Sequence, residues 1–165
     1  MLWNLQSVFL SESELYAEYE LDIRELSFNG GMPFKTPVKV SAKAVNRASI
    51  VDLAVAVKFD YTAPCDRCGE KTITTYDYSF KHTVVQALVG ENEDDYIEAP
   101  DFTVDMDAVV ISDILLELPS KYLCKEDCRG VCQKCGKNLN FGDCSCNLQE
   151  ADPRWEAIRN LLNEE

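Results

Sequence analysis

Eight cysteines constrain this chain more than any other feature, because six of them lie within 23 residues. The other two form a Cys-x2-Cys pair well upstream of that run. Four thiolates are the ligand set of a closed structural zinc site, so eight cysteines predict two zinc ions. The candidate metal ligands are Cys65, Cys68, Cys124, Cys128, Cys132, Cys135, Cys144 and Cys146.

Disulfide bonds are the alternative use of these cysteines, and the cellular compartment decides between the two. The N-terminal segment has no basic region, since its first positive side chain is Arg24, and no small-residue cleavage site follows an apolar run. We therefore expect no signal peptide and a cytoplasmic protein. Its thiols should stay reduced and bind zinc.

Glycine directly follows the second cysteine in two of the pairs. The segments read Cys65-Asp66-Arg67-Cys68-Gly69 and Cys132-Gln133-Lys134-Cys135-Gly136. This pattern is typical of a zinc knuckle, whose turn places both sulfurs on one metal and needs the positive φ that glycine permits. Each knuckle then requires a second pair of cysteines.

Loop length favours one division of the ligands. Cys144 and Cys146 follow the second knuckle closely enough to close a small loop with it, which leaves Cys124 and Cys128 for the first knuckle. The main alternative places the four consecutive cysteines from Cys124 to Cys135 on one metal.

The net charge argues against one large class of partners. At −13, the chain lacks the excess of Lys and Arg with which generic nucleic-acid-binding proteins neutralise phosphates. Each four-thiolate zinc site would add about two further negative charges. We therefore expect a basic protein partner, with direct RNA contact possible but secondary. The acidic stretch Glu91–Asp95 predicts a solvated loop, and the alternative is a contact surface for a basic partner.

Alternating apolar residues predict three half-buried strands of an antiparallel sheet. The three runs cover residues 38–44, 51–61 and 76–84. The second and third flank Cys65 and Cys68, which places the first knuckle at the tip of a long hairpin. Residues 15–26 fit a helix or a strand, and we favour a strand followed by a turn at Asn29-Gly30-Gly31.

A helix is predicted at about residues 107–118, capped by Asp105 or Asp107 and ended by Pro119. Its apolar stripe, expected to face the sheet, consists of Ile111, Ile114, Leu115 and Leu118. A second helix should begin at Asp152-Pro153, because proline is favoured in the first helical turn. We expect it to dock on the protein, and the alternative is an amphipathic helix that binds a partner.

Together these elements predict an α+β fold with an antiparallel sheet, barrel-like or open, packed by a helix. Residues 1–120 form the β-rich core that carries the first knuckle. Residues 121–150 form a cysteine-rich zinc-binding segment, and residues 151–165 form a terminal helix.

Catalytic interpretations each lack a required part. His82 is the single histidine, which leaves almost no material for conventional acid–base or triad chemistry. Pro64-Cys65-x2-Cys68 matches half of a zinc deaminase signature, but the H-x-E that carries the catalytic glutamate is missing. We therefore expect no enzyme activity and interpret His82 as a sheet residue beside Tyr78 and Phe80.

Five basic residues lie along the cysteine-rich run, namely Lys121, Lys125, Arg129, Lys134 and Lys137. They could compensate thiolate charge locally. They could equally form a small basic face that contacts RNA phosphates. The sequence leaves both interpretations open.

These motifs resemble the bacterial and plastid YceD family, the large ribosomal RNA subunit accumulation proteins. The resemblance covers nearly the whole chain and is specific from residue 60 onward. The matching motifs are Cys65-x-Arg67-Cys68; the acidic loop leading to Asp107 and the helix ending Leu116-Glu117-Leu118-Pro119; Cys124-x3-Cys128-Arg129-Gly130-Val131-Cys132-x2-Cys135-Gly136-x-Asn138-Leu139-Asn140; and Cys144-x-Cys146 with Asp152-Pro153-Arg154.

The resemblance implies a cytoplasmic, non-enzymatic protein needed for normal accumulation of large-subunit ribosomal RNA, in which metal supports the fold. The family's gene commonly lies beside one for a small large-subunit ribosomal protein, which implies a basic ribosomal protein or a pre-ribosomal particle as partner. The residues alone predict only a cytosolic, zinc-stabilised α+β binding module. The alternative function is a zinc-ribbon adaptor in a transcription complex or another protein complex.

Overall fold

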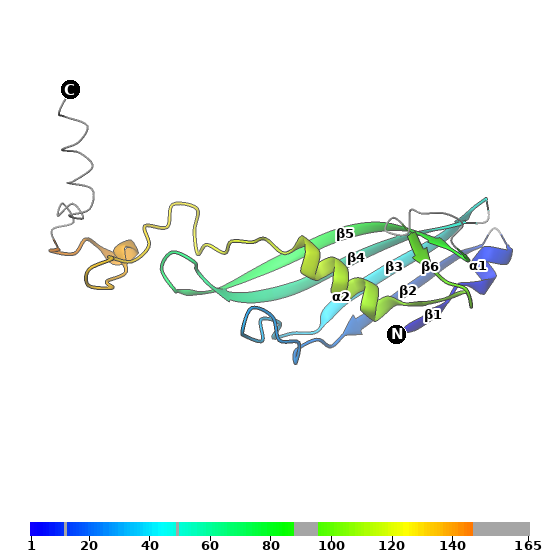
Figure 1. Ribbon diagram of the computed structural model, residues 1–165, viewed down its shortest axis with the longest axis horizontal. Coiled ribbons are helices and arrows are strands. Elements are labelled where there is room, and N and C mark those ends of the chain that lie inside the picture. Colours follow the sequence, from blue (N-terminus) through cyan, green and yellow to red (C-terminus); the bar gives the residue numbers. More distant parts are fainter. Residues whose placement is uncertain (12, 49, 88–95, 147–165) are drawn as a thin grey trace, which may run out of the picture. The chain divides into compact units, whose positions relative to one another are not determined.

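A computed structural model describes residues 1–11, 13–48, 50–87 and 96–146 (Figure 1). The acidic stretch Glu91–Asp95 and the helix expected at 151–165 lie outside these residues. The chain divides into two compact units. Unit 1 comprises Met1–Ala63 and Lys71–Tyr122, and unit 2 comprises Pro64–Glu70 and Leu123–Glu165.

Unit 1 is built on a five-stranded sheet with the strand order β2-β3-β4-β5-β6. The strands are β2 (Glu14–Leu21), β3 (Val38–Arg47), β4 (Ile50–Pro64), β5 (Lys71–Val85) and β6 (Tyr96–Glu98). Antiparallel pairs join β2 to β3 and β3 to β4, whereas β6 runs parallel to β5. The strands predicted from alternation are confirmed, and the described strands form an open, mixed sheet rather than a closed barrel.

The turn predicted after β2 is also confirmed. Phe28 and Gly31 exchange two backbone hydrogen bonds, of 2.9 and 3.1 Å, around Asn29 and Gly30. Both central residues have positive φ, 51° and 76°, which is the conformation that favours an Asn-Gly pair in a two-residue hairpin turn.

Four short elements of unit 1 were not predicted. They are β6 and three elements outside the five-stranded sheet, namely β1 (Leu2–Asn4), α1 (Gln6–Leu10) and β7 (Thr103–Asp105). β1 pairs antiparallel with β7, with Leu2 opposite Asp105, and the Leu5 N–H donates to the Phe102 carbonyl at 2.7 Å. Trp3 and Leu5 are buried by this arrangement. A strand of three residues is too short for alternation to reveal it.

The predicted helix is α2 (Met106–Glu117), and Asp105 caps it by accepting a hydrogen bond from the Asp107 N–H at 3.2 Å. Its fully buried residues are Met106, Val110 and Ile114, which repeat every four positions. Ile111 and Leu118 pack against the same core, as expected. Leu115 is half-buried like Ile111 and Leu118, but unlike them it does not pack against this core. The predicted stripe was therefore wrong in including Leu115 and in omitting Met106 and Val110.

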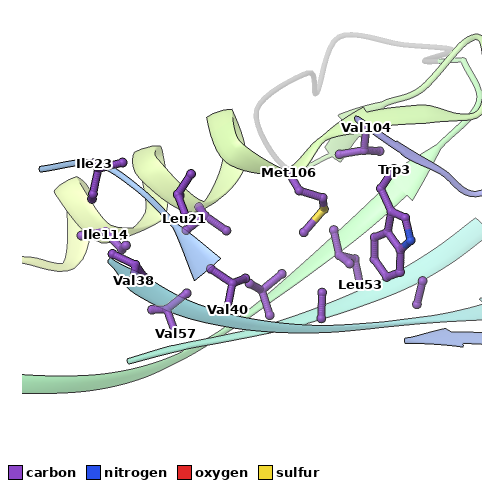
Figure 2. Close-up of a cluster of buried hydrophobic side chains, with 14 of the residues drawn as sticks. Trp3, Leu21, Ile23, Val38, Val40, Leu53, Val57, Val104, Met106 and Ile114 are labelled. Atoms are coloured by element: carbon purple, nitrogen blue, oxygen red, sulfur yellow. The ribbon is translucent and has the colours of Figure 1, made fainter. Parts of the chain in front are cut away.

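The core of unit 1 lies between α2 and one face of the sheet (Figure 2). Alternate residues of β3 and β4 point into it, from Val38 to Ala44 and from Val51 to Tyr61, and none of them is more than 4% exposed. Lys39 and Lys58 lie on the opposite face and are exposed. Figure 1 shows α2 lying along the sheet. No helix in the described part of the chain is long and apolar enough to cross a membrane.

Aromatic rings continue this core along β4 and β5. Tyr76, Tyr78 and Phe80 share one face of β5, as alternation predicted, and Tyr76 packs against both Phe59 and Tyr61 of β4. Tyr122, the last residue of unit 1, stacks on Tyr61 with 5.0 Å between ring centroids and 21° between planes.

Candidate metal centres

The eight cysteines of unit 2 form two groups of four, in each of which all sulfurs lie within 4.8 Å of one another. Tetrad 1 consists of Cys65, Cys68, Cys124 and Cys128, and tetrad 2 consists of Cys132, Cys135, Cys144 and Cys146. This grouping is the one favoured by loop length. The alternative, with the four consecutive cysteines on one metal, does not match this grouping, because Cys132 and Cys135 lie with Cys144 and Cys146.

The sulfur spacing in tetrad 1 fits a metal better than a disulfide. All eight cysteines are free thiols. Cys65 Sγ lies 3.8 Å from Cys128 Sγ, and Cys68 Sγ lies 3.6 Å from Cys124 Sγ. A disulfide needs about 2.05 Å, whereas a tetrahedral site with Zn–S bonds of about 2.3 Å separates its sulfurs by about 3.8 Å. Each tetrad could therefore hold a metal ion, and an all-sulfur tetrahedral donor set is typical of zinc or iron–sulfur sites.

The two knuckles use the same backbone turn. In each, the N–H of the first cysteine donates to the carbonyl five residues later, and the glycine N–H donates back to the carbonyl of that cysteine. All four hydrogen bonds measure 2.8 Å, and the glycine φ is 72° in both turns, so the predicted positive φ is confirmed. The residues are Cys65, Gly69 and Glu70 in the first knuckle and Cys132, Gly136 and Lys137 in the second.

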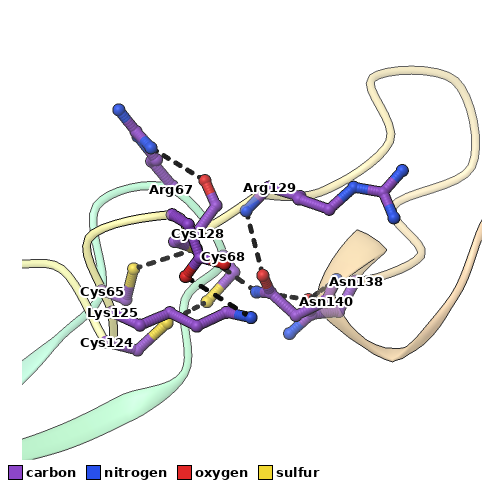
Figure 3. A network of polar contacts seen from close by, with 10 residues as sticks. Cys65, Arg67, Cys68, Cys124, Lys125, Cys128, Arg129, Asn138 and Asn140 are labelled. Atoms are coloured by element: carbon purple, nitrogen blue, oxygen red, sulfur yellow. Dashed lines mark hydrogen bonds and ion pairs between the residues drawn. The ribbon is translucent and has the colours of Figure 1, made fainter.

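The second pair of tetrad 1 comes from far along the chain (Figure 3). Its sulfur pairs join residues 63 and 56 positions apart in sequence. Arg67 Nη1 donates to the Cys128 carbonyl at 2.8 Å and so holds the two segments together. Gly130 passes so close to Arg67 that a Cβ there would lie 3.0 Å from the Arg67 carbonyl oxygen.

Backbone donors favour the thiolate form of the first cysteine in each knuckle. Burial opposes ionisation of Cys65, but the backbone groups of Cys124, Arg67 and Cys68 outweigh it and lower its pKa to about 6. For Cys132, donors from the Cys135 backbone, the Cys144 thiol and the Lys134 backbone lower the pKa to about 6. Because the thiolate is the metal-binding form, each turn prepares one ligand for a cation.

Other thiols of each tetrad have raised pKa values. Burial and the neighbouring thiols of Cys128 and Cys68 raise the pKa of Cys124 to about 12. The Cys135 thiol, together with burial, raises the pKa of Cys146 to about 12. Thiols this close cannot all ionise without a compensating cation. A bound metal ion supplies that charge and deprotonates the remaining ligands.

Asn138 and Asn140 lie near tetrad 1, and their sequence motif did not predict a role for them. Asn140 Nδ2 donates to Cys128 Sγ at 3.3 Å, and this bond is the largest cause that lowers the Cys128 pKa. Asn138 Oδ1 accepts from both the backbone N–H and Nδ2 of Asn140, at 3.0 and 2.9 Å. Residue type alone carried no signal for this contact, because it depends on the three-dimensional approach of one loop to one sulfur.

The basic residues of unit 2 lie beside carboxylates and carbonyls. Lys125 Nζ lies 3.7 Å from Asp127, Arg129 pairs with Asp143, and Lys137 Nζ donates to the Asp143 carbonyl at 2.7 Å. Three of the five basic residues are thus engaged with oxygen atoms of neighbouring residues. That the basic residues compensate thiolate charge stays a prediction.

His82 lies on β5, as interpreted from the sequence, and belongs to neither tetrad. Its Nε2 is 2.7 Å from Asp113 Oδ2 of α2, and both side chains are largely buried. This contact joins the helix to the sheet.

Three curated proteins and one family model show what the chain is similar to. The model of the large ribosomal RNA subunit accumulation protein YceD matches residues 53–162. A chloroplastic large ribosomal RNA subunit accumulation protein YCED homolog 1 of Arabidopsis thaliana is 27% identical over 78% of this chain. The uncharacterized protein YlbN of Bacillus subtilis is 24% identical over 88%, and the uncharacterized protein Rv2926c of Mycobacterium tuberculosis is 33% identical over 44%.

The chain spans about half the length of the plant relative, since the match covers 50% of it, and the match covers 86% of YlbN and 35% of the mycobacterial protein. No solved structure matches this chain. The resemblance stated from the sequence motifs is confirmed by the family match, which includes all eight cysteines.

Proposed function

The chain belongs to the YceD family of large ribosomal RNA subunit accumulation proteins, and on that premise we propose that it supports the accumulation or maturation of large-subunit ribosomal RNA in the cytoplasm. It does so as a non-enzymatic protein that binds two zinc ions and a ribosomal protein partner. The observation that carries this proposal is the family match over residues 53–162. The plant relative's name states the same role for that protein.

Zinc in this proposal is a structural ion. Four thiolates per ion leave no open coordination position for a substrate or a reactive water, which is the mark of a structural site. The thiols in the described part of the chain all lie in the two tetrads, and its histidine is engaged with Asp113. The metal then stabilises unit 2, and unit 2 presents a surface to a partner.

Charge favours a basic protein over naked RNA as that partner. The described residues of unit 2 include five basic side chains (Arg67, Lys125, Arg129, Lys134 and Lys137) and five acidic ones (Asp66, Glu70, Glu126, Asp127 and Asp143). Eight thiolates around two zinc ions add about four negative charges. An acidic surface attracts a basic ribosomal protein and accelerates its capture, whereas RNA binding needs an excess of positive charge.

Depletion of the protein in its own host tests the role in ribosomal RNA. The proposal expects less mature large-subunit RNA relative to small-subunit RNA, and restoration by the wild-type chain. Variants in which the cysteines of one tetrad are replaced by serine should restore less, because they lack the metal-stabilised unit. Unchanged ratios of the two ribosomal RNAs after depletion would contradict the proposal.

A pull-down from cell extract, with and without ribonuclease and analysed by mass spectrometry, tests the partner. A ribosomal protein that stays bound after ribonuclease treatment supports the proposal. Replacing Glu91, Glu93, Asp94 and Asp95 by the neutral amides should weaken this capture. Replacing Lys125, Arg129, Lys134 and Lys137 by glutamine removes the same number of charges and should matter less. Capture of RNA polymerase subunits would favour a transcription adaptor, and capture lost with ribonuclease would make RNA the direct ligand.

A further inference from the structure

The loop that closes tetrad 2 also contacts tetrad 1. This loop, residues 136–143, lies between Cys135 and Cys144, so its two ends are fixed by ligands of the second centre. From its middle, Asn140 Nδ2 donates to Cys128 Sγ of the first centre at 3.3 Å (Figure 3). One short loop therefore carries both a covalent link to one metal site and a hydrogen bond to the other.

Further bonds fix the loop against the segment that follows Cys128. The Arg129 N–H donates to Asn140 Oδ1 at 2.9 Å, and the Leu139 N–H donates to the Gly130 carbonyl at 2.9 Å. Arg129 also pairs with Asp143 near the end of the loop. These contacts align Asn140 so that its amide oxygen faces a backbone donor while its nitrogen faces the sulfur.

Asn138 fixes the orientation of the Asn140 side chain. Its Oδ1 accepts from the Asn140 amide nitrogen at 2.9 Å and from the Asn140 backbone at 3.0 Å. Its own amide nitrogen reaches Glu70 Oε2 of the first knuckle at 3.4 Å. The two asparagines thus connect the loop of tetrad 2 to both halves of tetrad 1.

The loop has little apolar packing to order it in the absence of these contacts. None of residues 136–143 is buried, and Phe141 is 77% exposed. A segment without a buried core stays ordered only through its ends and its hydrogen bonds. Metal at tetrad 2 would fix the two ends and so reinforce the hydrogen bonds that hold Asn140 at Cys128.

A hydrogen bond to a thiolate matters most when that thiolate carries metal-centred negative charge. A zinc ion with four thiolates keeps a net charge of about −2. A donor aimed at a buried sulfur stabilises that charge, and hydrogen bonds to charged groups are the stronger class. Cys128 is only 3% exposed, so water cannot replace the Asn140 donor easily.

We propose that Asn140 couples the two metal centres, so that metal at tetrad 2 raises the affinity of tetrad 1 for metal, and the reverse holds by linkage. This inference rests on the proposed zinc binding. Asn140 acts here as a positioning residue, since it ligates neither ion. Because hydrogen bonds to charged groups are among the stronger ones, we expect loss of this bond to lower the metal affinity of tetrad 1 about tenfold, which sets the expected size of the coupling.

Native mass spectrometry of the full-length, metal-free protein with one equivalent of zinc tests the coupling directly. It counts chains with zero, one and two ions. Coupling in the wild type enriches the zero- and two-ion species at the expense of the one-ion species. Asn140→Ala should raise the one-ion fraction, and Asn140→Asp, which keeps the size but places a negative charge at the sulfur, should raise it further. Phe141→Ala is the control in the same loop and should keep the wild-type distribution.

Site-resolved cadmium-113 spectra separate coupling from a purely structural effect. With both centres loaded, Asn140→Ala should shift the resonance of tetrad 1 and leave that of tetrad 2 in place. In a Cys144→Ser, Cys146→Ser background, tetrad 1 should bind cadmium about tenfold more weakly, and adding Asn140→Ala should change nothing further.

The outcomes separate this inference from the proposal it rests on. If the wild-type chain binds no zinc, both the coupling and the proposed zinc binding are contradicted. If wild type and Asn140→Ala both bind two ions and show the same one-ion fraction, the coupling is contradicted and the proposed zinc binding stands. An equal loss of tetrad 1 affinity from Asn140→Ala with and without tetrad 2 also overturns it, because the asparagine would then act locally. If the double-serine variant does not fold, Cys146→Ser alone is the background for the same comparison of tetrad 1 affinity with and without Asn140→Ala.

Discussion

Both tetrads contain the same type of knuckle turn, but the second pair of cysteines comes from a different distance along the chain in each. Both knuckles have the same hydrogen bonds and the same glycine φ. Tetrad 2 completes its site with Cys144 and Cys146, from the same short stretch of chain, whereas tetrad 1 joins residues 56 and 63 positions apart. The same local motif therefore closes a small loop in one place and a very long one in the other. The difference predicts unequal roles for the two ions.

The largest expected effect is the loss of a ligand from tetrad 1. Structural zinc stabilises small zinc-finger peptides by about 10–16 kcal/mol, so either site matters locally. Cys65→Ser should lower the melting temperature and raise hydrogen exchange in the first knuckle and around Cys124 and Cys128, because it frees the two segments that tetrad 1 joins across the long loop. Cys144→Ser should raise exchange mainly in residues 130–146. Equal and global destabilisation by both variants would refute the unequal roles.

The two tetrads should release zinc at different rates, because their cysteines differ in exposure to solvent. Cys135 of tetrad 2 is exposed, whereas Cys65 and Cys128 of tetrad 1 are buried. A chelator in excess should remove one zinc ion quickly and the second slowly, as followed with a zinc-sensitive dye. Cys144→Ser should abolish the fast phase. A fast phase that instead disappears in Cys65→Ser would reverse the assignment of the accessible site.

A matched pair of glycine variants measures how tightly each tetrad is packed. Gly130 and Gly136 both have φ of 72°, so alanine at either position costs about 1–2 kcal/mol of backbone strain. A Cβ at Gly130 would meet the Arg67 carbonyl at 3.0 Å, whereas a Cβ at Gly136 meets nothing within 4 Å. Gly130→Ala should therefore unfold at lower denaturant concentration than Gly136→Ala. The same midpoint for both variants would show that the close approach carries no cost.

The smallest difference is expected in pH dependence, because the tetrads have similar electrostatics. Cys65 and Cys132 have pKa values lowered to about 6, and Cys124 and Cys146 have pKa values raised to about 12. At pH 7.5 the first two are already thiolates, and the last two must lose protons when metal binds. Zinc affinity should fall as pH falls, more steeply below about pH 6 where the first two also protonate. Competition titrations from pH 5.5 to 8 should give parallel curves for the two sites, and an affinity that rises at low pH would contradict this.

Long, regular segments were predictable from the sequence, and short or distant contacts were not. Alternation over many residues in β3, β4 and β5 sets which face each side chain occupies. Loop length was sufficient to group the eight ligands. β1 escaped prediction because it has three residues and its partner β7 lies about a hundred positions away. The hydrogen bond from Asn140 to Cys128 was not predicted, because a single contact between an amide nitrogen and a sulfur produces no periodic pattern in the sequence.

The long loop closed by tetrad 1 also imposes an order in time. Chains are synthesised from the N-terminus, and early segments begin to fold while later ones are still being made. The hairpins of β2, β3 and β4 involve near neighbours in sequence and can form early. Cys65 and Cys68 then remain half of an incomplete metal site until Cys124 and Cys128 have been added to the chain. Capture of this ion is thus a late event, because most of the sequence has been synthesised when its last ligand is added. Zinc that is available at the end of synthesis and afterwards should therefore decide how many chains mature.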